Sequence, residues 1–335
     1  MNAPTEQPTI AVLTAPGVEP PTGIEEIEAR ADVRYTDTDG LADAVSGADA
    51  LLLWDFFSTA VRDVWSAASS LRWIHVAAAG VDKLLFDELR DSDVVVTNAR
   101  GVFDRPIAEF VLASILALAK DIHTSHDDQR ERRWQHRETR TVVGETALVV
   151  GTGAIGRETA RLLSAVGMDV RGAGRTARDG DPDFGEILES ANLAEHVGWA
   201  DHVVIAAPLT EQTRGLVDAR VVAAMKPTAH LVNIGRGEIV DEDALLDALN
   251  SGGIAAASLD VFCTEPLPAD SPLWTAPGLV VSPHMSGDVL GWRDTLARQF
   301  VANAQRFLDG EPLDNVVDKH LGFVPAETTR STRGR

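Results

Sequence analysis

The chain of 335 residues is long enough for two domains, each with its own hydrophobic core. Its formal net charge of −21 repels phosphate backbones, which argues against a nucleic-acid partner. No segment approaches the roughly 20 apolar residues of a membrane span. The opening MNAPTEQPT lacks the basic and apolar parts of a secretory signal, and the single Cys263 suits a reducing compartment. We therefore expect a cytoplasmic protein that binds neither nucleic acid nor membrane.

The first hundred residues predict a small open α/β domain. Near-continuous apolar runs are typical of strands in a parallel sheet that is covered on both faces. Four such runs occur: TIAVLTAP, ADALLLWD, LRWIHVAAAGVD and DVVVTNAR. Two segments between them have helical spacing, GLADAVSG and STAVRDVWSAAS.

A long helical segment is predicted over residues 105–134. Residues 107–119 are apolar nearly all round, which predicts burial against more than one neighbour, as between domains or in a subunit interface. His123, His126 and Asp127 have a spacing that allows shared helical faces. The polar run around them favours an exposed helix end over a metal site, so we expect no bound metal.

A second alternating series begins at Glu145 and predicts a doubly wound dinucleotide-binding domain. Its six expected strands are TALVVG, MDVRGAG, DHVVIAAP, HLVNIGRG, AAASLDVF and LVVSPH. AIGRETARLLSAVG and the well-capped DEDALLDALNSGG are expected helices between them. A last amphipathic helix over residues 290–308 is expected to return to the first domain.

The fold class predicted from this order is α/β, with two doubly wound parallel-sheet domains. The expected bounds are residues 1–103 with 289–323 for a flavodoxin-like substrate domain, 104–288 for a Rossmann domain, and 324–335 for a disordered polar tail.

A glycine-rich turn follows the first strand of the second series. Gly151 allows the tight turn, Gly153 lets the backbone approach a pyrophosphate, and Gly156 lets the helix pack close to the strand. The free N–H groups of Ala154 and Ile155 and the helix dipole would attract the phosphates. The alternative, that the glycines only turn the chain, is weaker because a strand precedes them and a helix follows.

The residues after the next strand bear on which dinucleotide is bound. An acid about 20 residues beyond the glycine turn holds the ribose of NAD in many such domains, but residues 170–178 contain none. Asp169 opens the strand rather than closing it. The strand end instead reads Gly174, Arg175 and Thr176, with Arg178 beyond. An arginine there accommodates a 2′-phosphate, so NADP(H) is the expected cofactor and NAD(H) the alternative; solvated loop residues are the competing interpretation.

Further polar residues lie at or just beyond the ends of predicted strands, where open α/β sheets bind ligands. They are Arg236, Asp260, Glu265 and His284. Each alone could be a surface ion pair or a helix cap, but together they are expected to face one crevice.

At these residues the sequence resembles the D-isomer-specific 2-hydroxyacid dehydrogenase family over about residues 70 to 323. The matching segments are LRWIHVAAAGVD, GVFDRPIAEFVLASILAL, VVGTGAIGRETARLL, PLTEQTRGLVD, LVNIGRGEIVDEDAL, SLDVFCTEPLP, VVSPHMSGD and GEPLDNVVDKHLGF. One departure is Gly235, where alanine is more usual; it looks harmless.

The resemblance implies a role for each matching residue. Arg236 would clamp the substrate carboxylate, and His284 would be the general acid in reduction and the general base in oxidation. Glu265 would hydrogen-bond to His284, favour its protonated form and raise its pKa. Hydride would pass between the nicotinamide C4 and the substrate C2. The implied cofactor contacts are Pro208, Thr213, Ile234 and Asp260, and the backbone N–H groups of Ala79 and Gly80 would bind the carboxylate in a cleft between the domains.

The resemblance predicts an NADPH-dependent 2-keto acid reductase. The family resemblance and the apolar helix over residues 107–119 together favour a homodimer. Aromatic residues around the expected substrate favour an apolar or aromatic 2-keto acid, although core packing explains them equally well; they are Trp54, Phe56, Phe57, Trp134 and Trp292. Glyoxylate, hydroxypyruvate and phenylpyruvate all stay open. The alternative from another class is a non-catalytic, dinucleotide-sensing protein that acts as a corepressor; formate or phosphite is a weaker option.

Overall fold

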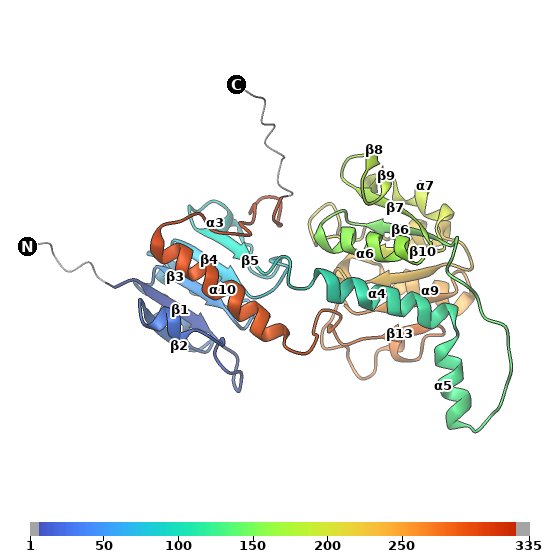
Figure 1. Cartoon of the computed structure of the whole chain (residues 1–335), viewed down its shortest axis with the longest axis horizontal. Helices are drawn as coiled ribbons and strands as arrows, with labels where there is room; N and C mark the ends of the chain where they lie inside the picture. The colour runs from blue at the N-terminus through green and yellow to red at the C-terminus, as the bar shows by residue number, and fades with distance from the viewer. Residues whose placement is uncertain (1–6, 326–335) are drawn as a thin grey trace, which may run out of the picture. The chain divides into compact units, whose positions relative to one another are not determined.

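The computed structural model describes residues 7–325, so most of the predicted polar tail, 326–335, lies outside the described part. The chain divides into two compact units, one of residues 1–102 with 290–335 and one of residues 103–289 (Figure 1). Each unit contains its own predominantly parallel sheet with helices packed on it, so the predicted α/β class is confirmed.

The first unit has a five-stranded, wholly parallel sheet in the order β2-β1-β3-β4-β5. Its strands are β1 (Thr9–Leu13), β2 (Asp32–Thr36), β3 (Ala50–Leu53), β4 (Trp73–Val76) and β5 (Val95–Asn98). Its helices are α1 (Glu25–Glu28), α2 (Leu41–Val45), η1 (Trp65–Ala67), α3 (Asp87–Arg90) and α10 (Trp292–Asp309). The late helix α10 packs on this early sheet, where the rings of Phe300 and Trp73 stack with centroids 5.8 Å apart (Figure 1).

Two expectations for the first unit are wrong. Strand β2 was not predicted because its sequence, DVRYT, is polar and its residues are half-buried or exposed at the sheet edge. The segment STAVRDVWSAAS forms turns and the short 3₁₀ helix η1 instead of an α-helix. Its apolar residues, such as Ala60 and Val61, are buried although they do not lie on a continuous helix.

The second unit has an eight-stranded sheet in the order β13-β12-β11-β10-β6-β7-β9-β8. Its strands are β6 (Thr146–Val150), β7 (Asp169–Gly174), β8 (Arg178–Asp181), β9 (Gly185–Glu189), β10 (His202–Ile205), β11 (His230–Asn233), β12 (Ala256–Leu259) and β13 (Leu279–Val281). All neighbouring pairs are parallel except β8 with β9. The six expected strands are present, and the hairpin of β8 and β9 was missed because its polar, glycine-containing sequence has no apolar run.

The helices of the second unit are α4 (Asp104–Ala119), α5 (Ile122–Arg130), α6 (Ala154–Ala165), α7 (Leu193–His196), α8 (Ala219–Ala224) and α9 (Glu242–Ser251), with the 3₁₀ helices η2 (Ser190–Asn192), η3 (Val197–Trp199), η4 (Gly237–Ile239) and η5 (Pro272–Thr275). The predicted long helix is broken between α4 and α5 by Asp121, whose φ of 51° is left-handed. Helices α4 and α6 lie side by side (Figure 1). The predicted caps of α9 are confirmed: Asp241 accepts from the Ala244 N–H at 3.0 Å, and Gly252 ends the helix at φ 72°. No helix within residues 7–325 combines the length and apolar character needed to cross a membrane.

Three histidines are buried in the sheets. His75 lies on β4 with Nδ1 2.8 Å from the Thr97 hydroxyl. His202 and His230 start β10 and β11 with their Nδ1 atoms 3.4 Å apart, and His202 Nε2 lies 2.8 Å from a Glu145 carboxylate oxygen. Burial lowers the pKa of His75 and of His230 to about 3. Burial also lowers the pKa of His202, although Glu145 opposes this.

Because these histidines are buried in a neutral form, we expect the free energy of unfolding of both units to fall in acid. In the unfolded chain a histidine takes up a proton near pH 6.5, whereas the buried ones stay neutral, so their contribution is complete above pH 6.5 and is lost as the pH falls. His75 and His230 should each lower the free energy of unfolding by about 1.6 kcal/mol between pH 6.5 and pH 5. Urea unfolding at these two pH values tests this expectation. His230→Asn should make the free energy of unfolding depend less on pH. A pH-independent free energy over this range would contradict it.

Candidate active site

The glycine turn lies between β6 and α6, and its backbone path needs glycine. Gly151 has a φ of 111°, and a Cβ there would lie 2.5 Å from the backbone nitrogen of Ala207. A Cβ at Gly156 would lie 1.9 Å from the Gly151 carbonyl oxygen. At Gly153, by contrast, a Cβ would meet nothing within 4 Å, so this position is open to an approaching group.

The open side of the turn fits the pyrophosphate of a dinucleotide. Gly153 is the N-cap of α6, and no side chain caps the helix. Ala154 and Ile155 begin the helix, where backbone N–H groups have no intrahelical acceptor. The first turn of α6 therefore presents donors and the positive end of the helix dipole beside a backbone without a side chain.

Strand β7 brings two further glycines against this turn. A Cβ at Gly172 would lie 3.0 Å from the Thr152 methyl carbon, and one at Gly174 would lie 3.2 Å from the Thr152 hydroxyl. The glycines thus leave space for Thr152, the middle residue of the turn. Arg175 and Thr176 follow directly beyond the strand, both exposed.

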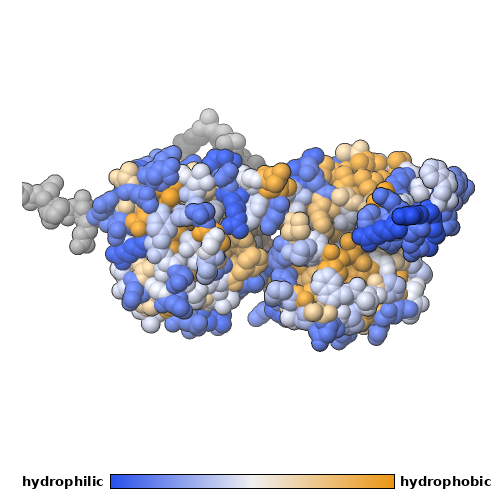
Figure 2. Space-filling view, turned by 90° about the horizontal axis from the view of Figure 1, so that it is seen from below, coloured by the Kyte–Doolittle hydropathy of each residue, from blue (hydrophilic) through white to orange (hydrophobic). Residues whose placement is uncertain are grey.

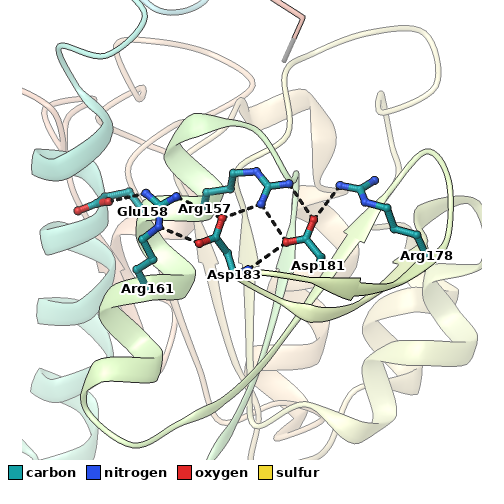
Figure 3. A network of polar contacts seen from close by, with 6 residues as sticks. All are labelled: Arg157, Glu158, Arg161, Arg178, Asp181 and Asp183. Atoms are coloured by element: carbon teal, nitrogen blue, oxygen red, sulfur yellow. Dashed lines mark hydrogen bonds and ion pairs between the residues drawn. The ribbon is translucent and has the colours of Figure 1, made fainter. Parts of the chain in front are cut away.

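Two acids of the hairpin of β8 and β9 were missed by the sequence reasoning. Glu189 ends β9 opposite Gly174 and is exposed, with a 3.4 Å hydrogen bond from Asn192. Asp181 ends β8, but its carboxylate already accepts hydrogen bonds from Arg157, Arg178 and the Asp183 N–H. Each oxygen of the Asp181 carboxylate therefore already accepts a hydrogen bond from the protein (Figure 3), so this carboxylate is not placed to bind a ribose hydroxyl. Only recognition of the hairpin could have revealed these acids.

The loop after β10 contains Pro208 and Thr213. The Thr213 hydroxyl donates to the Pro208 carbonyl at 2.6 Å and accepts from the Thr210 N–H at 2.8 Å. Thr213 thus ties residues 208–213 into a compact turn. This loop follows the carboxyl end of β10, which neighbours β6 in the sheet.

Arg236 follows β11 on a backbone shaped by Asn233. The buried Asn233 amide donates to the Arg236 carbonyl at 2.9 Å and accepts from the Gly235 N–H at 3.1 Å. Ile234 between them is buried. A Cβ at Gly235 would lie 2.8 Å from the Ala207 carbonyl oxygen, so this departure from the usual alanine is fitted to its surroundings.

His284 and Glu265 form a direct pair. Nδ1 of His284 lies 2.8 Å from Oε2 of Glu265, while Oε1 of Glu265 accepts from the Phe262 N–H at 3.0 Å. The two side chains are 30% and 24% exposed, so the imidazole is oriented by the carboxylate and still accessible. Nδ1 of His284 is thereby engaged by the carboxylate.

Asp260 braces the segment that carries His284. Its buried carboxylate accepts from the Ser282 hydroxyl at 2.6 Å, the Met285 N–H at 2.9 Å and the Ser286 N–H at 3.0 Å. His284 itself has a left-handed φ of 53°, a conformation that needs such support in a residue other than glycine.

The predicted carboxylate-binding backbone lies in the first unit, just after β4. The Asn98 amide donates to the Ala79 carbonyl at 2.6 Å, and the Ala99 N–H donates to the Ala78 carbonyl at 2.9 Å. Ala79 and Gly80 are half-buried. This short segment is therefore held by the neighbouring strand β5 and the residue that follows it.

The aromatic residues named from the sequence have different environments. Trp54 is buried and donates to the Glu19 carbonyl at 2.9 Å, so it belongs to the core of the first unit. Phe56 lies against Trp292 with ring centroids 6.0 Å apart. Phe57 is 49% exposed with the Lys83 ammonium 4.9 Å from its ring, whereas Trp134 in the second unit is fully exposed.

Metal-binding geometry is absent from the part of the chain that the structure describes. No group of three histidine, cysteine or acidic side chains in residues 7–325 could hold an ion. His123, His126 and Asp127 are exposed on α5, and Asp127 lies 4.0 Å from Arg130.

Comparisons with known proteins agree with this fold. The sequence pattern for "D-isomer specific 2-hydroxyacid dehydrogenase, NAD binding domain" matches residues 112–286. Glyoxylate reductase of Thermococcus gammatolerans is 31% identical over 308 residues, which cover 88% of this chain and 90% of that protein. D-3-phosphoglycerate dehydrogenase of Mycobacterium tuberculosis is 32% identical over 327 residues, 94% of this chain, but this chain spans only 60% of the relative's length.

Among solved structures, the D-isomer specific 2-hydroxyacid dehydrogenase of Xanthobacter autotrophicus, in complex with NADPH and MES, is similar with a TM-score of 0.80. It is 32% identical, and the match covers 94% of this chain and 99% of that one. The fold and the glycine turn define a nicotinamide-dinucleotide-binding protein. The chain belongs to the D-isomer specific 2-hydroxyacid dehydrogenase family.

Proposed function

We propose that the protein transfers a hydride between NADPH and the C2 carbonyl of a 2-keto acid. The observation that carries this proposal is the accessible His284–Glu265 pair, 2.8 Å apart, in a unit that also contains a complete glycine turn. The nicotinamide, when bound, supplies the hydride. Glu265 orients the His284 imidazole, and Nε2 of His284 gives a proton to the oxygen on which negative charge develops.

The remaining proposed roles are those that the family resemblance implies for the matching residues. The guanidinium of Arg236 binds the substrate carboxylate through its fork of donors. The first unit is thus the substrate domain and the second the cofactor domain. The cofactor residues of the second unit are Gly151, Gly153, Ala154, Ile155, Gly156, Pro208, Thr213, Ile234 and Asp260.

The preference for NADP(H) over NAD(H) rests on Arg175 and Thr176 at the end of β7. Both are exposed at the edge where the glycine turn lies, and the similar Xanthobacter structure contains NADPH. We expect Arg175→Ala to raise the Kd for NADPH by at least about tenfold, the loss of one charge-assisted hydrogen bond. The Kd for NADH should change less than about twofold. Equal losses for both cofactors would contradict recognition of a 2′-phosphate.

The substrate is proposed to be a small or aromatic 2-keto acid. Phe57 is half-exposed in the first unit, Phe56 packs against it, and Trp292 packs against Phe56. A spectrophotometric screen of glyoxylate, hydroxypyruvate and phenylpyruvate, with NADPH and NADH in parallel, tests the proposed function. Turnover with at least one acid, faster with NADPH, is expected. No turnover with any acid would overturn catalysis and leave the dinucleotide-sensing alternative.

A homodimer is proposed from the apolar residues that the second unit leaves accessible. Trp134 is fully exposed, Val143 is 66% exposed and Ile122 is 53% exposed. Figure 2 shows hydrophobic residues gathered on the face of this unit seen from below. A monomeric mass by sedimentation equilibrium would contradict the dimer.

A further inference from the structure

The loop that carries Glu265 is held by a neighbouring segment, part of which has no role in the function proposed above. Strands β11 and β12 are parallel neighbours, so the segments that follow them start at the same edge of the sheet. Residues 260–265 follow β12, and the segment after β11 runs through η4 into the first turn of α9. Arg236 is the N-cap of η4. The segment that carries the proposed carboxylate clamp therefore continues into residues that contact the loop of Glu265.

Gly237 lies directly against the peptide that joins Phe262 to Cys263. A Cβ at Gly237 would lie 2.0 Å from the Phe262 carbonyl carbon, 2.2 Å from the Cys263 nitrogen and 2.4 Å from the Phe262 oxygen. These three atoms belong to one peptide group, so the Gly237 backbone covers that group closely. Only glycine allows such an approach.

Glu242 holds the same peptide through its N–H group. Oε1 of Glu242 accepts from the Cys263 N–H at 2.7 Å. Glu242 is half-buried in the first turn of α9, whereas Asp241 caps that helix by accepting from the Ala244 N–H. The Glu242 carboxylate thus binds a backbone group outside its own helix. A hydrogen bond to an ionised carboxylate is about twice as strong as one between neutral groups.

A further hydrogen bond joins the held peptide to the proposed acid–base pair. The buried Phe262 donates its N–H to Oε1 of Glu265 at 3.0 Å. Oε2 of Glu265 lies 2.8 Å from Nδ1 of His284. A continuous series of contacts therefore runs from Glu242, through the peptide between Phe262 and Cys263, to Glu265 and His284.

We propose that Glu242 is a positioning residue that sets the place of the Glu265 carboxylate and, through it, of the His284 imidazole. This inference rests on the proposed hydride transfer, because it assigns part of the accompanying proton transfer to a contact outside the pair. Loss of Glu242 should leave the Arg236 backbone in place, since Asn233 holds that backbone by two hydrogen bonds of its own. The expected defect is therefore in kcat and not in KM for the 2-keto acid.

The test compares variants of Glu242 by steady-state reduction of a 2-keto acid with NADPH. Glu242→Ala should lower kcat by at least about tenfold, because small displacements of a reacting group have effects of this size, and should change KM by less than about twofold. Glu242→Gln keeps an oxygen that can accept from the Cys263 N–H, so its kcat should stay within about threefold of the wild type. If Glu242→Ala does not fold, Glu242→Met, which keeps the length of the side chain without an oxygen, should give the same loss.

The matched control is Asp243→Asn, which removes a negative charge from the same helical turn at an exposed position. Its kcat should stay within about twofold of the wild type, because an exposed charge has little effect on its surroundings. An equal loss of kcat in Asp243→Asn and Glu242→Ala would mean that the charge of the turn matters and the contact with Cys263 does not, which would overturn the inference.

A double-mutant cycle shows whether Glu242 acts through Glu265. In a Glu265→Gln background, Glu242→Ala should lower kcat further by less than about twofold. Additive losses of kcat would overturn the inference, as would a defect of Glu242→Ala in KM alone. A wild type that reduces no 2-keto acid would overturn the proposed function, and this inference with it. Near-normal kcat in Glu242→Ala beside an active wild type would overturn the inference alone.

Discussion

Replacing His284 with glutamine should lower kcat by about 10²- to 10⁴-fold, the usual share of general acid–base catalysis. Glutamine can still donate a hydrogen bond from this position, but it cannot deliver a proton to the forming alkoxide. The loss should appear in kcat with each 2-keto acid that the wild type reduces. The Kd for NADPH should stay within about twofold of the wild-type value.

A matched control for this variant is His126→Gln on α5. His126 is exposed and contributes nothing to the proposed site, so its variant should keep wild-type turnover. Near-normal kcat in His284→Gln would remove the imidazole from the mechanism. An equal loss in both variants would indicate a general effect of the substitution on folding.

Removal of Arg236 should have the second large effect. Arg236→Ala should lower kcat/KM for 2-keto acids by about 10²- to 10³-fold, because a charge-assisted clamp on the carboxylate is lost in both the ground state and the transition state. KM should rise and kcat should fall. Arg236→Lys keeps the charge but not the planar fork, so it should recover only part of the loss.

Arg214→Ala is the control for a lost surface charge near this loop. Arg214 is 60% exposed and lies 3.9 Å from Glu238, a contact with little energetic consequence. Its variant should behave as the wild type does. An unchanged KM in Arg236→Ala would contradict the role of this residue as the carboxylate clamp.

The sequence predicted those elements whose pattern is dictated by burial. Continuous apolar runs identified β1, β3 and β4, because central parallel strands are covered on both faces, and also the edge strand β5, whose residues are mostly buried. The elements that were missed lie at or next to a sheet edge and have one side that faces solvent. Strand β2 and the hairpin of β8 and β9 are polar for this reason, and no apolar period marks them.

The geometry of the candidate site depends on contacts between residues far apart in the chain. His284 and Glu265 are 19 positions apart, and only the resemblance to a family linked them before the structure gave a distance. Arg157 and Asp181 are 24 positions apart, and no motif or period relates them. Their contact requires the hairpin of β8 and β9, so it could not be predicted without the fold.

The glycines of β7 show how the structure sharpened a prediction. The absence of an acid at Gly174 predicted room for a 2′-phosphate. The structure adds that Gly172 and Gly174 leave space for Thr152 and for Ile187 of the hairpin, which packs on this strand. The glycines thus let the hairpin of β8 and β9 pack closely against β7.

The transfer of deuterium from NADPH labelled at the hydride-donating position of C4 tests the central claim most directly. Hydroxypyruvate and phenylpyruvate are each incubated with the labelled cofactor, and the hydroxy acids are analysed by mass spectrometry and chiral chromatography. The account predicts one deuterium at C2 of a D-hydroxy acid, and none in reactions with His284→Gln over the same time. A hydroxy acid without deuterium at C2, or of the L configuration, would contradict it.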